Sequence, residues 1–145
     1  TLHTNDSPSS IPRLLDLGVP PYLVTATVVG IIAQRLLRKV CQHCKVPRQL
    51  SVEERTYLQL SDENLTVYEG EGCKECRGTG YKGRTGIFEV LEMNERTRGM
   101  VSDKTDVAEL VRAAEQDGFM SLRQLAIRKM LEGTTTYDEV ISITG

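Results

Sequence analysis

The sequence predicts a mixed α/β protein that carries a small metal-binding module. Two observations predict the α/β class. Apolar residues recur at helical spacing near both ends of the chain, and residues 87–93 alternate between apolar and acidic residues as a strand does. The third observation is a pair of Cys-x-x-Cys motifs, Cys41–Cys44 and Cys73–Cys76. Together they supply the four sulfur ligands that tetrahedral Zn²⁺ prefers.

Helix signals occupy both ends of the chain. Residues 7–17 have apolar residues at helical spacing, with Pro8 in the first turn and Gly18 as the stop. A second helix is expected over residues 20–32, although its Thr and Val content also suits a strand. The remaining helices are expected over residues 97–101, 106–118, 121–133 and from 136 onward. The last three begin with capping-box patterns or close variants of them.

The middle of the chain is expected to contain short strands around the cysteines. Residues 33–40 predict a strand that leads into the first cysteine motif. The 28 residues between the two motifs, 45–72, should have structure of their own, with a capped helix over 51–60 and a strand over 65–69. Glycines keep the backbone flexible before the strand at 87–93; they are Gly78, Gly80, Gly83 and Gly86.

Composition favours a soluble globular protein of one ordinary domain or two small ones. The chain has 145 residues, 39% of them hydrophobic and 26% charged, and a net charge of −2. This balance gives no strong attraction to nucleic acid or anionic membrane, and 5% aromatics offer few stacking platforms for a single strand. The longest mostly apolar stretch, 22–33, is too short to span a bilayer, and residues 1–5 are not a signal peptide. Paired thiols then suit a reducing cytoplasm.

The four cysteines have more than one chemical interpretation. A closed four-thiolate site would be structural, because no position is left for a water molecule. A redox pair would need one motif at a helix N-terminus and only two essential cysteines. A catalytic metal is a further alternative, and His43, inside the first motif, could replace a cysteine ligand, although its flanked position favours an exposed bystander.

Two alternatives concern the module as a whole. The string from Cys73 to Gly80 resembles the zinc-domain repeat of J-protein chaperones. Those chaperones use four such repeats, whereas the first motif here lacks the glycines and no His-Pro-Asp signature occurs. A stand-alone zinc-ribbon binding or adaptor module is the other alternative, and it predicts that the natural reading frame begins near Thr1.

Four stretches of the chain resemble one protein family, the ATPases of type II secretion and type IV pilus assembly. They are similar to its His box with the following helix, the segment before its tetracysteine motif, that motif with the following glycines, and the C-terminal end. In this sequence they are Thr1-Leu-His3-Thr-Asn5 with Ile11 to Gly18, Ala33 to Cys41, Gly72 to Glu89, and Gly133 to Val140. The resemblance covers nearly the whole chain.

The resemblance implies a fold and a division into domains. Residues 1–40 would be the end of a RecA-like P-loop NTPase core. Residues 41–82 would form a tetracysteine zinc module, and residues 83–145 a strand followed by a terminal helical bundle. The chain would thus be the C-terminal remainder of an α/β motor domain.

The resemblance also implies roles for individual residues. His3 would be the His-box residue that faces the γ-phosphate, and Arg84 would lie near the nucleotide or a subunit boundary. A salt bridge at the start of a strand is an equally good interpretation of Arg84. Arg35 and Arg38 are expected to serve an interface or the structure rather than catalysis.

Several parts of such a motor are not in this sequence. It contains no Gly-x-x-x-x-Gly-Lys-[Ser/Thr] loop to cradle phosphates, and it opens on Thr1 as a fragment would. We therefore expect ATP and Mg²⁺ to bind only the full-length protein and the chain alone to hydrolyse nothing. The expected partners are other copies of the subunit in a hexamer and the platform protein of the inner membrane. The protein would be cytoplasmic and peripheral to that membrane, with an acidic surface on the zinc module for docking.

Overall fold

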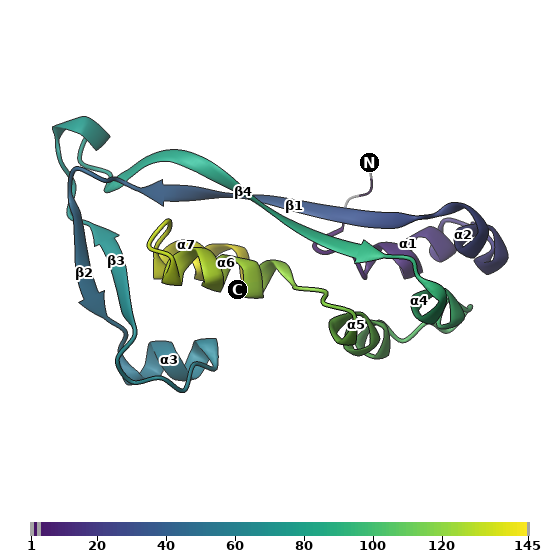
Figure 1. Cartoon of the computed structure of the whole chain (residues 1–145). Helices are drawn as coiled ribbons and strands as arrows, with labels where there is room; N and C mark the ends of the chain where they lie inside the picture. The colour runs from purple at the N-terminus through teal and green to yellow at the C-terminus, as the bar shows by residue number, and fades with distance from the viewer. Residues whose placement is uncertain (1, 3, 145) are drawn as a thin grey trace. The chain divides into compact units, whose positions relative to one another are not determined.

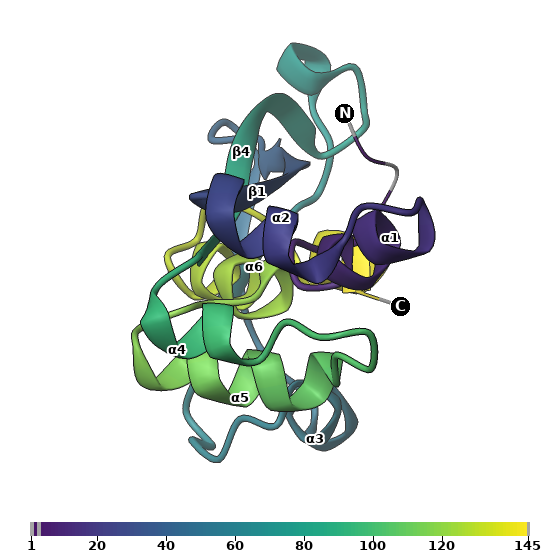
Figure 2. The ribbon, with the colours of Figure 1, turned by 90° about the vertical axis from the view of Figure 1, so that its right-hand side faces the viewer.

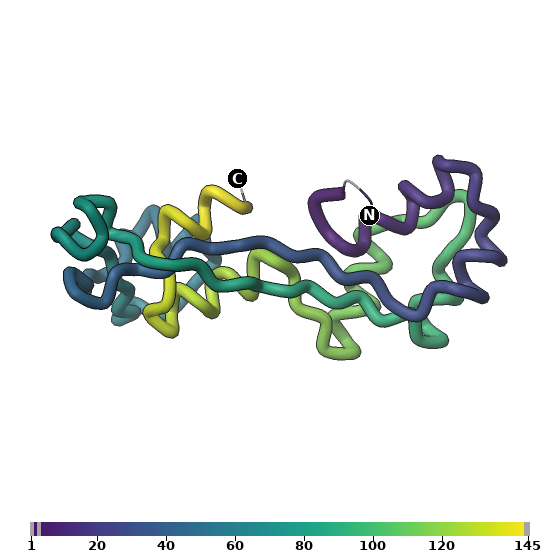
Figure 3. Tube along the Cα trace, turned by 90° about the horizontal axis from the view of Figure 1, so that it is seen from above, coloured from purple at the N-terminus to yellow at the C-terminus, as the bar shows by residue number. Residues whose placement is uncertain are grey.

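Figure 1 shows the chain in a computed structural model that describes Leu2 and residues 4–144. Helices and strands are mixed along the chain, which confirms the α/β class. The chain forms two compact units, one joining Thr1–Gln34 to Phe88–Leu122 and the other joining Arg35–Ile87 to Arg123–Gly145. Two long strands, β1 (Gly30–Val40) and β4 (Tyr81–Glu92), pair with each other, and each contributes residues to both units (Figure 3).

The first unit surrounds a small apolar core. Its helices are α1 (Ser10–Asp16), α2 (Pro21–Thr27), α4 (Glu95–Gly99) and α5 (Val107–Gln116). Figure 2 shows α4 lying against α5. The buried core residues come from α1, from β4 and the residue that follows it, and from α5; they are Ile11, Leu91, Met93, Leu110 and Ala114. The Asp106 carboxylate caps α5, since it accepts hydrogen bonds from the N–H groups of Ala108 and Glu109 at 2.8 and 3.2 Å.

The second unit contains an antiparallel strand pair that frames the cysteines. Strand β2 (Lys45–Gln49) pairs with β3 (Thr66–Gly70), with Lys45 opposite Gly70 and Gln49 opposite Thr66. Helix α3 (Val52–Leu58) connects them, and a single 3₁₀ turn, η1 (Lys74–Cys76), follows β3. The remaining helices are α6 (Leu122–Leu131), whose first residue belongs to the first unit, and α7 (Tyr137–Thr144).

Three expectations from the sequence are wrong in detail. The second helix ends at Thr27 instead of residue 32, and β1 begins at Gly30, because the β-branched residues there pair with β4. Strand β4 begins at Tyr81, six residues before the predicted start at 87, so the part of the glycine-rich stretch that contains Gly83 and Gly86 is a strand. Strand β2 was not predicted, since it is short and contains Pro47.

Among the helices of the described part of the chain, none is long and apolar enough to cross a membrane.

Candidate metal centre

The four cysteine thiols lie together in the second unit. All four sulfur atoms are within 4.8 Å of one another. The sulfur atoms of Cys41 and Cys73 are 3.9 Å apart, those of Cys44 and Cys76 are 3.8 Å apart, and those of Cys73 and Cys76 are 3.7 Å apart. Zinc–sulfur bonds of about 2.3 Å in a tetrahedron place neighbouring sulfurs about 3.8 Å apart. The four cysteines could therefore hold one metal ion.

Backbone hydrogen bonds hold the two cysteine motifs against each other. The Cys41 N–H donates to the carbonyl of Gly80 at 2.9 Å, where β1 ends and β4 is about to begin. The Glu71 N–H donates to the carbonyl of Cys44 at 3.1 Å, directly beside the β2–β3 pair. Backbone hydrogen bonds therefore connect the two cysteine motifs at two points, one at the end of β1 and one beside β2 and β3.

Gly80 occupies a position that needs glycine for two reasons. Its φ of +76° lies in the left-handed region, and a Cβ there would stand 2.4 Å from the carbonyl oxygen of Gly70. This close approach lets the Gly80 N–H donate to the Cys76 sulfur at 3.2 Å. The Cys73 N–H donates to the same sulfur at 3.1 Å. Two backbone donors thus stabilise negative charge on one ligand atom.

The electrostatic surroundings differ among the thiols. Burial opposes ionisation of Cys76, but its hydrogen bonds with the N–H groups of Cys73 and Gly80 and with the thiols of Cys73 and Cys44 together outweigh burial and lower its pKa to about 6. Burial raises the pKa of the Cys44 thiol to about 12, although the Gly72 N–H opposes this rise. One thiol of the group is therefore ready to ionise, whereas the full set of four thiolates requires a cation to neutralise it.

The structure also bears on the alternatives for the cysteines. His43 is exposed, and among the described residues the group able to share an ion consists of the four cysteines. All four thiols are free of disulfides. Cys73 precedes a 3₁₀ turn of only three residues. Such a turn has a much smaller dipole than the α-helix whose N-terminus lowers the pKa of redox cysteines.

The two candidate residues outside the metal group have different outcomes. His3 lies outside the described residues. Arg84 is an exposed residue of β4 and borders a shallow cavity of about 220 Å³, together with Arg38 and Tyr81. Arg84 and the four cysteines belong to the same unit of the chain. The role of His3 stays a prediction.

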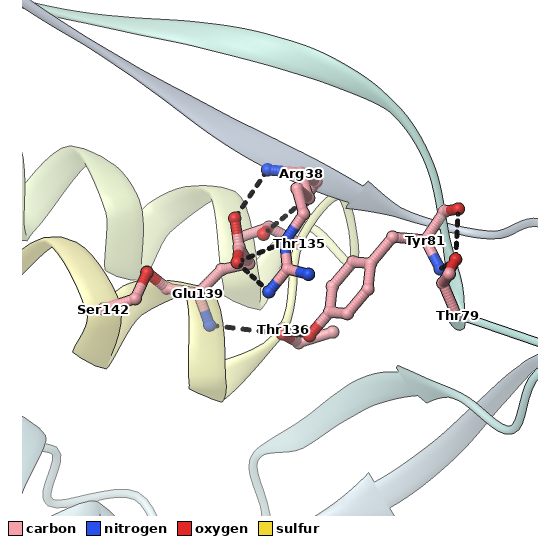
Figure 4. A network of polar contacts seen from close by, with 7 residues as sticks. All are labelled: Arg38, Thr79, Tyr81, Thr135, Thr136, Glu139 and Ser142. Carbon is pink, nitrogen blue, oxygen red and sulfur yellow. Dashed lines mark hydrogen bonds and ion pairs between the residues drawn. The ribbon is translucent and has the colours of Figure 1, made fainter.

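Arg38, expected to serve an interface or the structure, forms the polar network shown in Figure 4. The Arg38 Nε donates a hydrogen bond to Glu139 Oε1 at 2.7 Å, and Arg38 Nη2 lies 2.6 Å from the same oxygen. The Arg38 backbone N–H donates to Glu139 Oε2 at 2.7 Å. The hydrogen bond to Glu139 raises the pKa of Arg38 above its ordinary value. The guanidinium also stacks on Tyr81, at 4.0 Å from the ring centroid, and the Tyr81 hydroxyl contacts Thr136 Oγ1 at 2.8 Å. This network joins β1 and β4 to the start of α7.

The sequence reasoning missed this role of Glu139. Glu139 stands at the last position of a capping-box pattern, and its N–H does donate to Thr136 Oγ1 at 3.3 Å. Its carboxylate, however, bonds Arg38, which lies 101 residues earlier. A contact at that separation leaves no local signal in a single sequence.

Replacing Glu139 with Ala should destabilise the protein by about 2 kcal/mol, because the part-buried Arg38 N–H loses its acceptor and the guanidinium loses its partner. A chain of this size should then melt about 5 °C lower. Thermal unfolding followed by circular dichroism measures the change. Asp138→Ala is the matched control, since Asp138 is the exposed neighbour and its replacement should leave the midpoint nearly unchanged. Equal midpoints for the two variants would contradict the importance of the network.

Comparison with known proteins identifies the family that this chain resembles. The family model described as "Type II/IV secretion system protein" matches residues 1–142. The chain is 42% identical to the type IV pilus assembly ATPase TfpB of Acinetobacter baylyi, over 99% of the chain and 25% of that protein. It is 40% identical to the type IV pilus assembly ATPase PilB of Myxococcus xanthus, over 99% of the chain and 26% of that protein.

Proteins of the other machine are similar as well. The chain is 37% identical to the type II secretion system protein E of Pseudomonas aeruginosa, over 99% of the chain and 29% of that protein. The chain spans about a quarter of the length of these relatives. The match to the family model runs through both units and includes all four cysteines. The chain therefore belongs to the family of type II/IV secretion system proteins.

Proposed function

We propose that this chain is the C-terminal region of a hexameric cytoplasmic ATPase that powers type II secretion or type IV pilus assembly. The observation that carries the proposal is the family match over residues 1–142. Relatives whose names say pilus assembly ATPase and relatives named type II secretion system protein E are similar over 99% of the chain. Both kinds of machine therefore stay within the proposal.

The proposed architecture follows the resemblance. Residues 1–40 would be the end of the RecA-like core, residues 41–82 the zinc module, and residues 83–145 a strand with a terminal helical bundle. In support, the β2–α3–β3 segment lies between the two cysteine motifs, and residues 93–144 contain only helices as regular elements. ATP and Mg²⁺ would be bound largely by parts of the full-length protein outside this sequence.

The proposed metal is structural zinc, held by Cys41, Cys44, Cys73 and Cys76. Zinc would supply a cross-link among four thiolates, in a closed site without a position for water. The backbone groups of this chain would orient the ligands, since the N–H groups of Cys73 and Gly80 already point at the Cys76 sulfur. The function of the site would be to brace the β2–α3–β3 segment.

We propose that His3 contacts or senses the γ-phosphate and that Arg84 acts near the nucleotide or at a subunit boundary. The support for His3 is its place in a His-box resemblance within the matched region. The support for Arg84 is its exposure, which leaves the guanidinium accessible to another molecule. An arginine in either place could neutralise phosphate charge.

The proposed partners are further copies of the subunit and the platform protein of the inner membrane. The braced module would be the docking surface, and the protein would be peripheral to the membrane through this contact. In support, the module exposes acidic side chains; they are Glu53 in α3, Asp62 and Glu63 after it, Glu69 in β3 and Glu71 just after β3. Nucleic acid is not a proposed partner, since the net charge is −2.

The test compares ATP hydrolysis by the full-length subunit and by its His3→Ala variant. We expect the wild type to hydrolyse Mg-ATP and the variant to lose about 100-fold in kcat, because a group that positions phosphate is removed. Zinc content should be the same in both. His43→Ala is the matched control, since this exposed histidine should be dispensable.

Three outcomes would contradict the proposal. A full-length wild type without ATP hydrolysis would remove the ATPase assignment, and an unaffected His3→Ala variant would remove the role of His3. The chain of residues 1–145 alone should show no turnover, since it contains no phosphate-binding loop. Turnover by this chain would contradict its assignment as one region of a larger motor.

A further inference from the structure

Glu89 is a buried carboxylate whose function neither the metal site nor the core explains. It lies in β4 and is 1% exposed. Its Oε1 accepts hydrogen bonds from the backbone N–H of Ser7 at 2.6 Å and from the Ser7 hydroxyl at 2.7 Å. Its Oε2 accepts a hydrogen bond from the Leu122 N–H at 2.7 Å. All of these groups belong to the first unit.

Burying a carboxylate among neutral donors is expensive unless both oxygens are satisfied. Glu89 meets this condition with three charge-assisted hydrogen bonds, which are stronger than neutral ones. The sequence contains a signal for it. In the alternating strand, Glu89 falls on the buried side with Ile87 and Leu91, where an apolar residue is expected.

The segment that Glu89 holds is itself tightly turned. Ser7 is fully buried. On either side of it, Thr4 Oγ1 contacts Ser10 Oγ at 2.8 Å, and the Ser9 N–H donates to Asp6 Oδ1 at 2.8 Å. These local bonds fix the shape of the turn before α1, and Glu89 fixes the turn to β4. The backbone of residues 4–10 is thus held on both sides of Ser7.

We infer that Glu89 is a positioning residue for ATP hydrolysis, which holds the turn at Ser7 that follows the His box in the sequence. This inference rests on the proposed function, because it assumes that His3 acts at the phosphate. His3 precedes Ser7 by four residues, and Thr4, its direct neighbour, is already part of the turn. Glu89 itself does not touch the reacting atoms. It acts through the backbone of the segment that follows the His box.

The bonding pattern explains why a carboxylate is needed here rather than an amide. Glu89 receives donors on both oxygens, on one side from Ser7 and on the other from Leu122. Glutamine would present an oxygen to one side and an NH₂ donor to the other. One backbone N–H would then face another donor, so either Ser7 or Leu122 would have to move.

The experiment measures kcat and KM for Mg-ATP in the full-length subunit carrying Glu89→Gln. We expect kcat to fall about 10-fold while KM changes less than two-fold, because the phosphate-binding loop lies elsewhere in the protein. Glu92→Gln is the matched control, an exposed glutamate of the same strand, and it should behave as wild type. Zinc content should be equal in all variants.

A double-mutant cycle distinguishes positioning from a general loss of stability. In a His3→Ala background, Glu89→Gln should cause no further loss of kcat, since both changes remove the same contribution. Ser7→Ala is the second variant, and it decides the question if Glu89→Gln does not fold. It removes only the hydroxyl donor, so we expect about a three-fold loss of kcat in the wild-type background and none with His3→Ala.

The possible failures are distinguishable. An inactive wild-type subunit, or an unaffected His3→Ala variant, would overturn the proposed function on which the inference rests. An active subunit that loses kcat with His3→Ala but not with Glu89→Gln or Ser7→Ala would overturn the positioning role alone. Independent, multiplicative losses in the double mutants would also overturn it.

Discussion

Replacing Cys76 with Ser should prevent the protein from binding the proposed zinc ion and unfold the β2–α3–β3 segment. The Cys76 sulfur is the ligand atom that receives two backbone N–H groups, and it lies within 4 Å of two other sulfurs. Binding of zinc to four thiolates contributes on the order of 10 kcal/mol or more to the folding of small domains at neutral pH. Elemental analysis should find no stoichiometric zinc, and amide hydrogen exchange should lose protection in β2 and β3.

His43→Ala is the control for this experiment. His43 lies between Cys41 and Cys44 in the sequence, but its side chain is exposed. The variant should keep its zinc and the protection of β2 and β3. Loss of zinc in His43→Ala, with retention in Cys76→Ser, would mean that the histidine and not this thiol is a ligand.

Replacing Gly80 with Ala should destabilise the second unit by about 3 kcal/mol or more, because two costs combine. An alanine at a φ of +76° costs about 1–2 kcal/mol. Its Cβ would in addition lie 2.4 Å from the Gly70 carbonyl oxygen, so the backbone must move and the Gly80 N–H would lose the Cys76 sulfur. Chemical denaturation of the zinc-loaded protein measures the loss of stability. Zinc competition with a chelator measures the loss of zinc affinity that is expected when the Gly80 N–H no longer bonds the Cys76 sulfur.

Gly78→Ala is a closely matched control. Gly78 has a φ of +77°, almost the same as Gly80, but an added Cβ would meet nothing within 4 Å. This variant should show only the backbone cost of about 1–2 kcal/mol and a nearly unchanged zinc affinity. If the two variants had equal stability and equal zinc affinity, the contact between Gly70 and Gly80 would be unimportant.

Local signals predicted much of the fold. The capping box at Ser51 forms as expected, since Ser51 Oγ accepts from the Glu54 N–H at 3.2 Å and the Ser51 N–H donates back to Glu54 at 2.8 Å. Asp106 caps α5 in the same local way. The proximity of the four cysteines was also predictable, because their spacing within each motif and their number already suggest one shared group of ligands.

The features that sequence reasoning missed depend on contacts between distant segments. Strand β2 exists because β3 pairs with it, although Pro47 and its short length disfavour a strand. Residues 30–32 carry both helix and strand signals, and pairing with β4 decides between them. Glu139 and Glu89 bind partners 101 and 82 residues away, so no local pattern identifies these partners, although the alternation of β4 already places Glu89 on the buried side.

The closed four-thiolate zinc site is tested most directly by the metal content of the chain purified under reducing conditions. Native mass spectrometry should find one zinc per chain, and each single Cys→Ser replacement at 41, 44, 73 or 76 should abolish stoichiometric binding, since the site needs all four thiolates. A chain without zinc that forms a Cys41–Cys44 disulfide on mild oxidation would contradict the site. Full zinc content after the loss of either cysteine pair would contradict it as well.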